Sequence, residues 1–381
     1  MAAAQSGDVV VVGGGPIGLA IAWRAAASGL RTVVLDAGGP GAWQVAAGML
    51  APVAEVDFGE RSLLELGLRS AERFPAFAAE LAEASGRDPG HRTAGTLVVA
   101  RDADEAAALE RLHAFRTELG LGVERLRPSQ ARRAEPALAP TVRLALDIAG
   151  DHAVDPRRLV AALAEAAERA GAELRTARVA ALRTGGGRVL GVTLAGGEAV
   201  PAGAVVVAAG VGASRLEGIP AEAAIPVRPV KGQIMRLRDP TGHHPRPPLV
   251  ERTVRGEQCY LVPRGDGRYV LGATMEERGH DTAPTAGGVY ELLRDMSEIV
   301  PGVLELEIAE LDAGLRPATP DNLPAIGRGA LDGLYWAAGH FRNGILNTPV
   351  TAELVLAALG GEPLPDWAAP ADPLRFARVA A

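Results

Sequence analysis

Residues 8–36 read DVVVVGGGPIGLAIAWRAAASGLRTVVLD, the most informative pattern in the chain. The run Val9–Val12 is β-branched and too short for a helix, which is typical of a strand buried on both faces. Helical composition follows from Leu19 to Ser28, and a second apolar run, Thr32–Leu35, ends at Asp36. The order of strand, glycine turn, helix, strand and acidic residue predicts a βαβ unit.

The glycines of this turn have the spacing of a dinucleotide-binding fingerprint. Gly13, Gly15 and Gly18 form G-x-G-x-x-G. The first allows a tight turn, the second lets a pyrophosphate approach the backbone, and the third lets helix and strand pack closely. Asp36 stands where a carboxylate accepts hydrogen bonds from ribose hydroxyls. The alternatives are a structural glycine turn and a solvated strand end, and the motif alone does not separate NAD from FAD.

The composition is that of an ordinary globular protein and narrows the function classes. Of 381 residues, 48% are hydrophobic and 22% are charged, which excludes a disordered chain. The net charge of −7 and the lack of a basic run argue against a nucleic-acid partner. The single cysteine, Cys259, cannot form an internal disulfide, and the seven histidines have no ligand spacing, so no metal site is expected.

Two features bear on localisation. The first residues lack the basic and apolar regions of a signal peptide. The longest apolar stretch, Val9–Trp23, is interrupted by glycines and Pro16, and no run reaches about 18 uninterrupted apolar residues. We therefore expect a cytoplasmic protein that does not cross a membrane.

Two kinds of predicted strand indicate two interleaved domains. Fully apolar strands are expected at 204–210 and 334–339. Residues 233–238 instead alternate with period two, as half-exposed antiparallel strands do, and a hairpin is expected within 259–274. The other predicted elements are helices 61–83, 103–119, 155–170 and 351–359 and strands 173–182, 188–194 and 304–312.

The predicted fold class is therefore α/β. A discontinuous Rossmann-like domain that binds the dinucleotide is expected at 1–90, 150–225 and 312–381. An α+β substrate domain built on an antiparallel sheet is expected at 91–149 and 226–311. The chain would pass repeatedly between the two domains.

Four further segments carry a family resemblance. Residues 42–55 read AWQVAAGMLAPVAE, and residues 259–264 read CYLVPR, followed by GATM at 272–275. Residues 314–327 read GLRPATPDNLPAIG, and residues 339–346 read GHFRNGIL. Together with the fingerprint, these segments resemble the D-amino-acid oxidase superfamily of FAD enzymes, and within it the glycine oxidase branch. The resemblance runs in order from Asp8 to about Leu359.

The resemblance implies a substrate site. Arg316 would hold the substrate carboxylate, since a guanidinium fork suits a carboxylate bidentately, and Tyr260 would place its hydroxyl beside it. These two are the expected catalytic residues, with Arg342, Met49 and Met275 also lining the pocket. The alternatives are an ion pair of Arg316 with Asp312 or Asp321, a core tyrosine, a surface Arg342 and two core methionines.

The resemblance also implies FAD, bound non-covalently because no cysteine lies near residues 316–321. Residues 41–44 read GAWQ where the family often has serine and threonine, so the resemblance does not specify the phosphate contacts at these residues. The expected FAD-binding residues are Gly13, Gly15, Pro16, Ile17, Gly18, Asp36, Ala37, Ala47, Gly48, Met49, Val179, His340, Phe341, Arg342, Asn343, Gly344, Ile345 and Leu346.

The activity implied by the resemblance is oxidative deamination of glycine, sarcosine or small D-amino acids by hydride transfer to flavin N5. The imine would hydrolyse to glyoxylate and ammonia, O2 would become hydrogen peroxide, and the product would serve thiazole formation in thiamine biosynthesis. The expected partners are a small amino acid, O2, further copies of the chain and thiazole synthase. The alternatives are a D-amino-acid or sarcosine dehydrogenase with another electron acceptor, a non-catalytic FAD-bearing subunit and an NAD-binding regulatory module.

Overall fold

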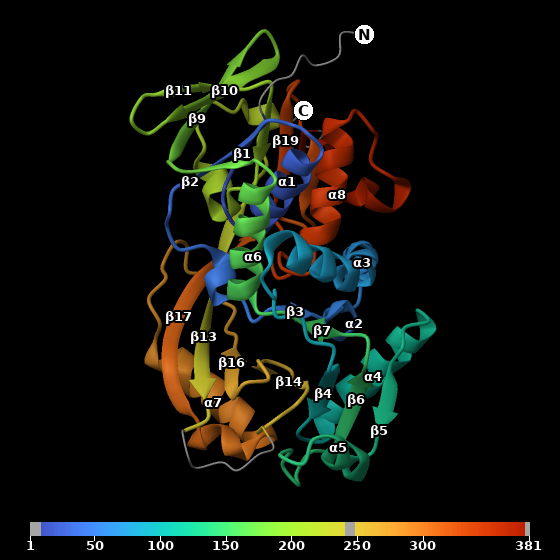
Figure 1. Ribbon diagram of the computed structural model, residues 1–381. Coiled ribbons are helices and arrows are strands. Elements are labelled where there is room, and N and C mark those ends of the chain that lie inside the picture. Colours follow the sequence, from blue (N-terminus) through green and yellow to red (C-terminus); the bar gives the residue numbers. More distant parts are fainter. Residues whose placement is uncertain (1–8, 241–247, 378–381) are drawn as a thin grey trace.

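The computed structural model describes residues 9–240 and 248–377, which fold around two large sheets (Figure 1). The first sheet has the strand order β18-β19-β12-β1-β2-β8. All its pairs are parallel except β18 with β19. Its strands are β1 (Val9–Val12), β2 (Thr32–Asp36), β8 (Glu173–Thr176), β12 (Ala204–Val207), β18 (Ala325–Arg328) and β19 (Leu334–Ala338).

Both faces of this sheet are covered, which explains the fully apolar strands. Val9 and Val11 pack against a layer of helices, whereas Val10 and Val12 pack against a small antiparallel sheet. The helices are α1 (Pro16–Ala27), α3 (Arg61–Ser85), α6 (Pro156–Arg169) and α8 (Thr348–Leu359). The small sheet contains β9 (Val179–Gly185), β10 (Arg188–Leu194) and β11 (Ala199–Pro201).

The second large sheet has the order β17-β13-β16-β15-β14-β4-β6-β5. Its pairs are antiparallel except β14 with β4. The strands are β4 (Thr96–Ala100), β5 (Glu124–Leu126), β6 (Leu144–Ile148), β13 (Arg228–Arg238), β14 (Thr253–Arg255), β15 (Tyr260–Pro263), β16 (Arg268–Gly272) and β17 (Glu307–Ala318).

One face of the second sheet packs against α5 (Pro128–Ala134) and α7 (Ala286–Ile299). The part of the other face around β4 and β6 packs against α2 (Pro52–Glu55) and α4 (Ala103–Glu118). The short strands β3 (Met49–Leu50) and β7 (His152–Ala153) pair with each other. In Figure 1 they lie, with α2, between the two large sheets. The remaining short elements are η1 (Ala42–Val45), η2 (Gly210–Arg215), η3 (Ala221–Ala223), η4 (Pro301–Glu305), η5 (Asp366–Ala371) and α9 (Leu374–Ala377).

Several predicted elements have different bounds in the structure; the helix expected at 351–359 begins at Thr348, and the strand expected at 233–238 begins at Arg228. The expected strand 173–182 is two strands in different sheets, because the backbone pairs with Asp36 up to Ala177 and then pairs with β10 from Val179. The expected strand 304–312 begins at Glu307 and continues to Ala318, since its pairing with β13 continues that far. The expected strand 204–210 ends at Val207, and the 3₁₀ helix η2 begins at Gly210.

The α/β fold class is confirmed, and the helices expected at 61–83, 103–119 and 155–170 are present within two residues of their predicted ends. The division into 1–90, 150–225 and 312–381 against 91–149 and 226–311 stays a prediction. β17 crosses the expected boundary at 312 as one continuous strand, so we propose that residues 312–318 belong with the second sheet. Within residues 9–240 and 248–377, no helix is long and apolar enough to span a membrane.

Candidate active site

The fingerprint turn is tightly packed against its neighbours. Gly13 has φ +112°, and a β-carbon there would come within 2.8 Å of the carbonyl carbon of Ala208. A β-carbon at Gly18 would collide with the Gly13 carbonyl oxygen. Gly15 is the N-cap residue directly before α1, whose first turn has Pro16 and no acidic residue. The bare backbone at the start of a 12-residue helix is therefore a cradle that fits a diphosphate.

Asp36 lies at the end of β2, where it closes this turn. Its Oδ2 accepts a hydrogen bond from the Gly14 amide at 2.6 Å, and its Oδ1 accepts one from the Gly38 amide at 2.7 Å. Ala37 is exposed beside it, and Val179 begins β9 two residues after Ala177, whose amide bonds Asp36. Asp36 is thus oriented by the backbone, with Ala37 and Val179 at the same end of the sheet.

The 41–44 segment brings an indole to the fingerprint. A β-carbon at Gly15 would lie 3.7 Å from the Trp43 ring, and one at Gly41 would lie 2.8 Å from it. Gln44 accepts a hydrogen bond from the Gly41 amide at 2.9 Å through its side-chain oxygen. An aromatic wall therefore stands where the family often has small hydroxyl residues.

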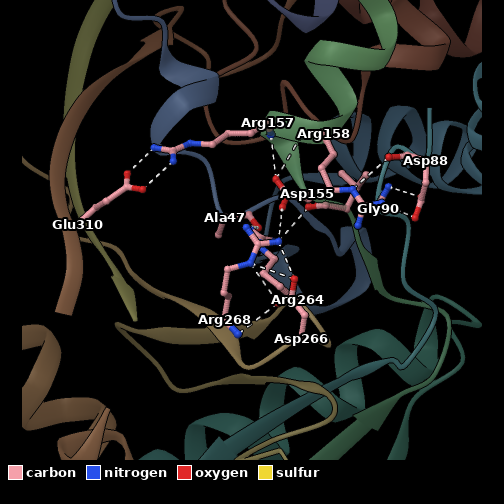
Figure 2. Close-up of polar contacts among 11 residues, drawn as sticks. Ala47, Asp88, Gly90, Asp155, Arg157, Arg158, Arg264, Asp266, Arg268 and Glu310 are labelled. Carbon is pink, nitrogen blue, oxygen red and sulfur yellow. Dashed lines mark hydrogen bonds and ion pairs between the residues drawn. The ribbon is translucent and has the colours of Figure 1, made fainter. Parts of the chain in front are cut away.

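Arg264 holds the segment around Ala47 and Gly48, as Figure 2 shows. Its Nη2 donates to the Ala47 carbonyl at 2.8 Å, and its Nη1 donates to the Val154 carbonyl at 3.0 Å. Burial lowers the pKa of Arg264 to about 10. Gly48 has φ +78°, and a β-carbon there would collide with the Val154 carbonyl, so the chain runs close to its neighbour.

The same region ties α6 to the second sheet. Asp155 caps α6 by accepting a hydrogen bond from the Arg157 amide at 3.0 Å. The Arg157 guanidinium then binds Glu310 of β17 with two hydrogen bonds, of 2.8 Å and 2.5 Å (Figure 2). A bidentate pair is more directional than a single contact, so it connects α6 and β17 in a defined geometry.

Segment 339–346 lies beside the end of β17. The Phe341 amide donates to the Pro317 carbonyl at 2.7 Å, and Phe341 has φ +47°. His340 is buried, with its Nε2 2.9 Å from the Thr351 hydroxyl oxygen, and burial lowers its pKa to about 3. Asn343, Gly344, Ile345 and Leu346 then lead into α8 through turns. The segment therefore reaches the strand that carries Arg316.

Arg316 and Tyr260 come together on one face of the second sheet. Arg316 Nη1 donates to the Thr274 carbonyl at 3.0 Å and to the Lys231 carbonyl at 3.2 Å. The Tyr260 ring lies against Gly272, where a β-carbon would be 2.8 Å from its hydroxyl oxygen. Burial raises the pKa of Tyr260, and the nearby Arg316 charge partly offsets that rise.

The ion pairs considered as alternatives for Arg316 do not form. Asp321 instead pairs with Arg375 at 2.8 Å, and Asp312 lies 4.0 Å from Arg157. Among the residues that the structure describes, no carboxylate pairs with Arg316. This leaves a half-buried guanidinium whose charge the surrounding protein does not neutralise by an ion pair.

The other expected pocket residues are distributed differently. Met49 is half-buried and packs with Tyr260 in one apolar cluster. Met275 is 59% exposed, so the structure does not bring it into that cluster. Arg342 turns toward α3, with Nη2 3.6 Å from a Glu60 oxygen and its Nε buried without a partner. It lines a small hollow with Glu55 and Glu60.

Three residues that position the site had no role in the sequence analysis. Lys231 is fully buried, and its ammonium donates to Asp281 and to the Ala283 carbonyl, each at 2.6 Å. Gly232 leaves space for Arg316, and Arg264 binds Ala47. Arg264 stood within a quoted motif, but its partner is more than two hundred residues away, so sequence spacing carried no signal.

With this geometry in view, the comparisons assign the family. The family described as FAD dependent oxidoreductase matches residues 8–358, and the chain belongs to this DAO family. It is 38% identical over 356 residues to glycine oxidase of Geobacillus kaustophilus, which covers 91% of each chain. It is 36% identical to the bifunctional protein ThiO/ThiG of Synechocystis sp., and the match covers 91% of this chain and 51% of that protein.

Solved structures agree with this assignment. Glycine oxidase from Geobacillus kaustophilus matches with a TM-score of 0.88 at 36% identity, over 96% of this chain and 98% of that chain. Iminodiacetate oxidase IdaA from Chelativorans sp. matches with a TM-score of 0.83 at 30% identity, over 94% and 97%. The resemblance seen in the motifs is confirmed. The chain is an FAD-dependent amine oxidoreductase, and FAD is its non-covalently bound cofactor.

Proposed function

We propose that this enzyme oxidises glycine, and also sarcosine and small D-amino acids, with Arg316 and Tyr260 holding the substrate carboxylate. The observation that carries the proposal is the unneutralised guanidinium of Arg316 beside the Tyr260 phenol. A half-buried cation without a protein carboxylate favours an anionic ligand, and a guanidinium fork matches a carboxylate. The similarity to two glycine oxidases supports the same substrate class.

The residues that would hold FAD are those placed at the end of the first sheet and along segment 339–346. The backbone of Gly13, Gly15 and Gly18 would take the diphosphate, and Asp36 a ribose hydroxyl. Ala47, Gly48 and the turns before α8 would border the flavin ring. FAD, when bound, supplies a two-electron acceptor that takes a hydride at N5 and passes the electrons on to O2.

The protein's own part is binding and orientation. Arg316 and Tyr260 fix the carboxylate, which limits the rotation of the small substrate and directs its Cα–H bond. The C–H bond breaks with its electron pair, the amine lone pair forms the C=N bond, and water converts this imine to glyoxylate and ammonia. Overall, glycine, O2 and water give glyoxylate, ammonia and hydrogen peroxide.

The substrate must arrive with a free amine, because only the neutral nitrogen has a lone pair to form the imine. His340 is unsuited to be a base, since it is buried, bonds Thr351 and has a pKa lowered to about 3. We propose that solvent removes the ammonium proton before or during binding, with no protein base required.

The alternative is a D-amino-acid or sarcosine dehydrogenase that passes electrons to an acceptor other than O2. Visible spectra of the purified enzyme test the two proposals together. Anaerobic glycine should bleach the flavin absorbance, and air should restore it with one hydrogen peroxide per glycine. Bleaching without reoxidation by air would favour the dehydrogenase, and no bleaching by glycine would contradict the proposed substrate.

A matched pair of variants tests Arg316 and Tyr260, which together we call the clamp. Arg316→Gln should abolish bleaching at substrate concentrations that saturate the wild type. Arg328→Gln, which removes an exposed arginine on β18, should bleach normally. Equal behaviour of the two variants would remove Arg316 from substrate binding.

We propose further that the product serves thiazole formation in thiamine biosynthesis. The similarity to a protein named ThiO/ThiG supports this link, and thiazole synthase is then the expected downstream partner. Transfer of the imine product to purified thiazole synthase would test it. Assembly into homo-oligomers and a cytoplasmic location remain predictions.

A further inference from the structure

We infer that Arg255 forms a second anion-binding position beside the clamp, so that the enzyme also accepts small amino acids that carry a second carboxylate. This inference rests on the proposed function, because it widens the substrate class of the same site.

The register of the second sheet places Arg255 on the face that carries the clamp. Arg255 of β14 lies directly opposite Tyr260 of β15, and Tyr260 lies opposite Gly272 of β16. Directly opposite residues share a face of the sheet, with β-carbons about 4.5–5.5 Å apart. The neighbours Val254 and Leu261 belong to the core under α7, on the other face. Arg255 and Arg316 therefore flank Tyr260 from two sides.

The charge of Arg255 is not neutralised by the protein. It is half-buried, and within residues 9–240 and 248–377 it forms no side-chain hydrogen bond or ion pair. Arg252, three residues earlier, does pair, with Asp147 at 2.5 Å. Arg255 is close enough to oppose the burial-induced rise in the pKa of Tyr260, whereas Glu55 adds to that rise. The groups around Tyr260 are thus two arginines and one glutamate.

The span between the two arginines suits a short dicarboxylate. Arg255, Tyr260 and Gly272 lie in one row with Ile234 of β13, and Arg316 reaches from β17 over Gly232, two residues from Ile234. β13 and β14 are three strand spacings apart, about 14 Å, and the two-residue offset adds about 7 Å along the strands. The long side chains of Arg316 and Arg255 shorten the distance between their guanidinium groups. One molecule whose two carboxylates are separated by three atoms could then contact both groups. Iminodiacetate has this length, and it differs from sarcosine only by the second carboxylate.

The oxidation would be unchanged in this substrate class. Arg316 would hold one carboxylate, the adjacent C–H bond would break as in glycine, and the second carboxylate would stay intact on Arg255. Arg255 would therefore act in recognition and add no chemical step.

A binding experiment tests the inference without turnover. Glutarate and butyrate replace the nitrogen of iminodiacetate and sarcosine by carbon, so neither can be oxidised at that position. Their dissociation constants are measured on the holoenzyme from perturbation of the flavin absorbance. We expect glutarate to bind at least tenfold tighter than butyrate, and this preference to disappear in Arg255→Gln but persist in Arg238→Gln.

Arg238→Gln is the matched control, because it removes an exposed arginine from the same sheet. Arg255→Lys keeps the charge but loses the planar fork, so it should retain part of the preference for glutarate. This variant replaces Arg255→Gln in the experiment if Arg255→Gln does not fold. Equal binding of glutarate and butyrate by the wild type, or an unchanged preference in Arg255→Gln, would overturn the inference.

Turnover separates this inference from the proposed function. The ratio of kcat/KM for iminodiacetate to that for sarcosine should fall at least tenfold in Arg255→Gln. If glycine and sarcosine are oxidised and the ratio does not change, Arg255 is not the second position while the proposed function stands. If glycine is not oxidised at all, the proposed function fails, and the glutarate preference still decides the role of Arg255.

Discussion

The guanidinium of Arg316 lies against the bare backbone of Gly232, where a β-carbon would come within 2.5 Å of Arg316 Cζ. Gly232 is in the middle of β13 with extended backbone, so its conformation does not require glycine. Space alone requires it. Arg316 lies opposite Val230, two residues before Gly232 on β13. Because Gly232 has no side chain, the Arg316 guanidinium can lie over the backbone of β13.

Gly232→Ala should therefore damage substrate binding more than folding. The added methyl group would displace Arg316 from the Thr274 and Lys231 carbonyls, so we expect KM for glycine to rise by about tenfold or more. Gly287→Ala in α7 is the matched control, since a β-carbon there meets open space. Steady-state kinetics with thermal unfolding of both variants checks this. An unchanged KM in Gly232→Ala would show that Arg316 does not hold the carboxylate.

Arg316→Lys tests the fork itself. A lysine keeps the positive charge but cannot offer two parallel donors. Weakening one partner of a desolvated charge pair costs about 2–5 kcal/mol, so kcat/KM for glycine should fall about 30-fold or more. The measurement is kinetics on folded, FAD-loaded variant. A near-native kcat/KM would mean that another residue holds the carboxylate.

The parts predicted from sequence were those with local causes. The β1–α1–β2 unit and the hairpin of β15 and β16 follow from glycine spacing and short-range alternation. Both could therefore be predicted from the local sequence. The break after Ala177 and the extension of β17 depend on pairing partners far along the chain. The same holds for the site: motifs indicated Arg316, but the importance of Gly232 appears only when β17 lies beside β13.

Asp151 should make stability fall as pH rises through the acid range. It is fully buried and accepts hydrogen bonds from the amides of Val53 at 3.2 Å and Ala54 at 2.6 Å, and burial raises its pKa to about 7. An unfolded aspartate has a pKa of about 3.9, so between these two values the folded state binds the proton more tightly. Folding stability from this group is therefore largest below pH 4 and is lost at about 1.4 kcal/mol per pH unit up to pH 7.

Asp151→Asn removes this titration. Urea unfolding is measured at several pH values between 4 and 8. The difference in unfolding free energy between wild type and variant should change from pH 4 to about pH 7 and be constant above about pH 7. Parallel stability curves for the two proteins would contradict the assigned burial effect.

Activity should rise with pH because the substrate amine, and not the clamp, titrates. Burial raises the pKa of Tyr260 above its usual value of about 10, and His340 stays neutral because its pKa is lowered. The neutral fraction of glycine grows about tenfold per pH unit below the amine pKa, so kcat/KM should rise steadily from pH 7 to pH 9. The rise should persist in Asp151→Asn, which excludes that buried carboxyl as its cause. A flat profile from pH 6 to pH 9 would indicate a protein group that deprotonates the substrate.

Substrate size should be limited mainly by Met49. Met49 packs with Tyr260 in one cluster, whereas Met275 is 59% exposed and is less able to crowd the space around the substrate Cα. An apolar pocket separates substrates that differ by one methylene by about 1–3 kcal/mol, so D-alanine should be slowed but not excluded. D-phenylalanine would have to displace packed side chains, which costs about 1–3 kcal/mol or more for each insertion, so it should not react.

Met49→Gly should then raise the kcat/KM ratio of D-alanine to glycine by about tenfold or more, and Met275→Gly should change it much less. With carboxylate and amine both held, L-alanine would direct its methyl group, and not its Cα hydrogen, toward the hydride acceptor. It should therefore be inert in the wild type and in both variants. Kinetics on glycine, D-alanine, L-alanine and D-phenylalanine decides the matter. If the wild type oxidises D-phenylalanine as fast as glycine, or if Met275→Gly has the larger effect, the pocket is not shaped by Met49, and a general D-amino-acid oxidase describes the enzyme better.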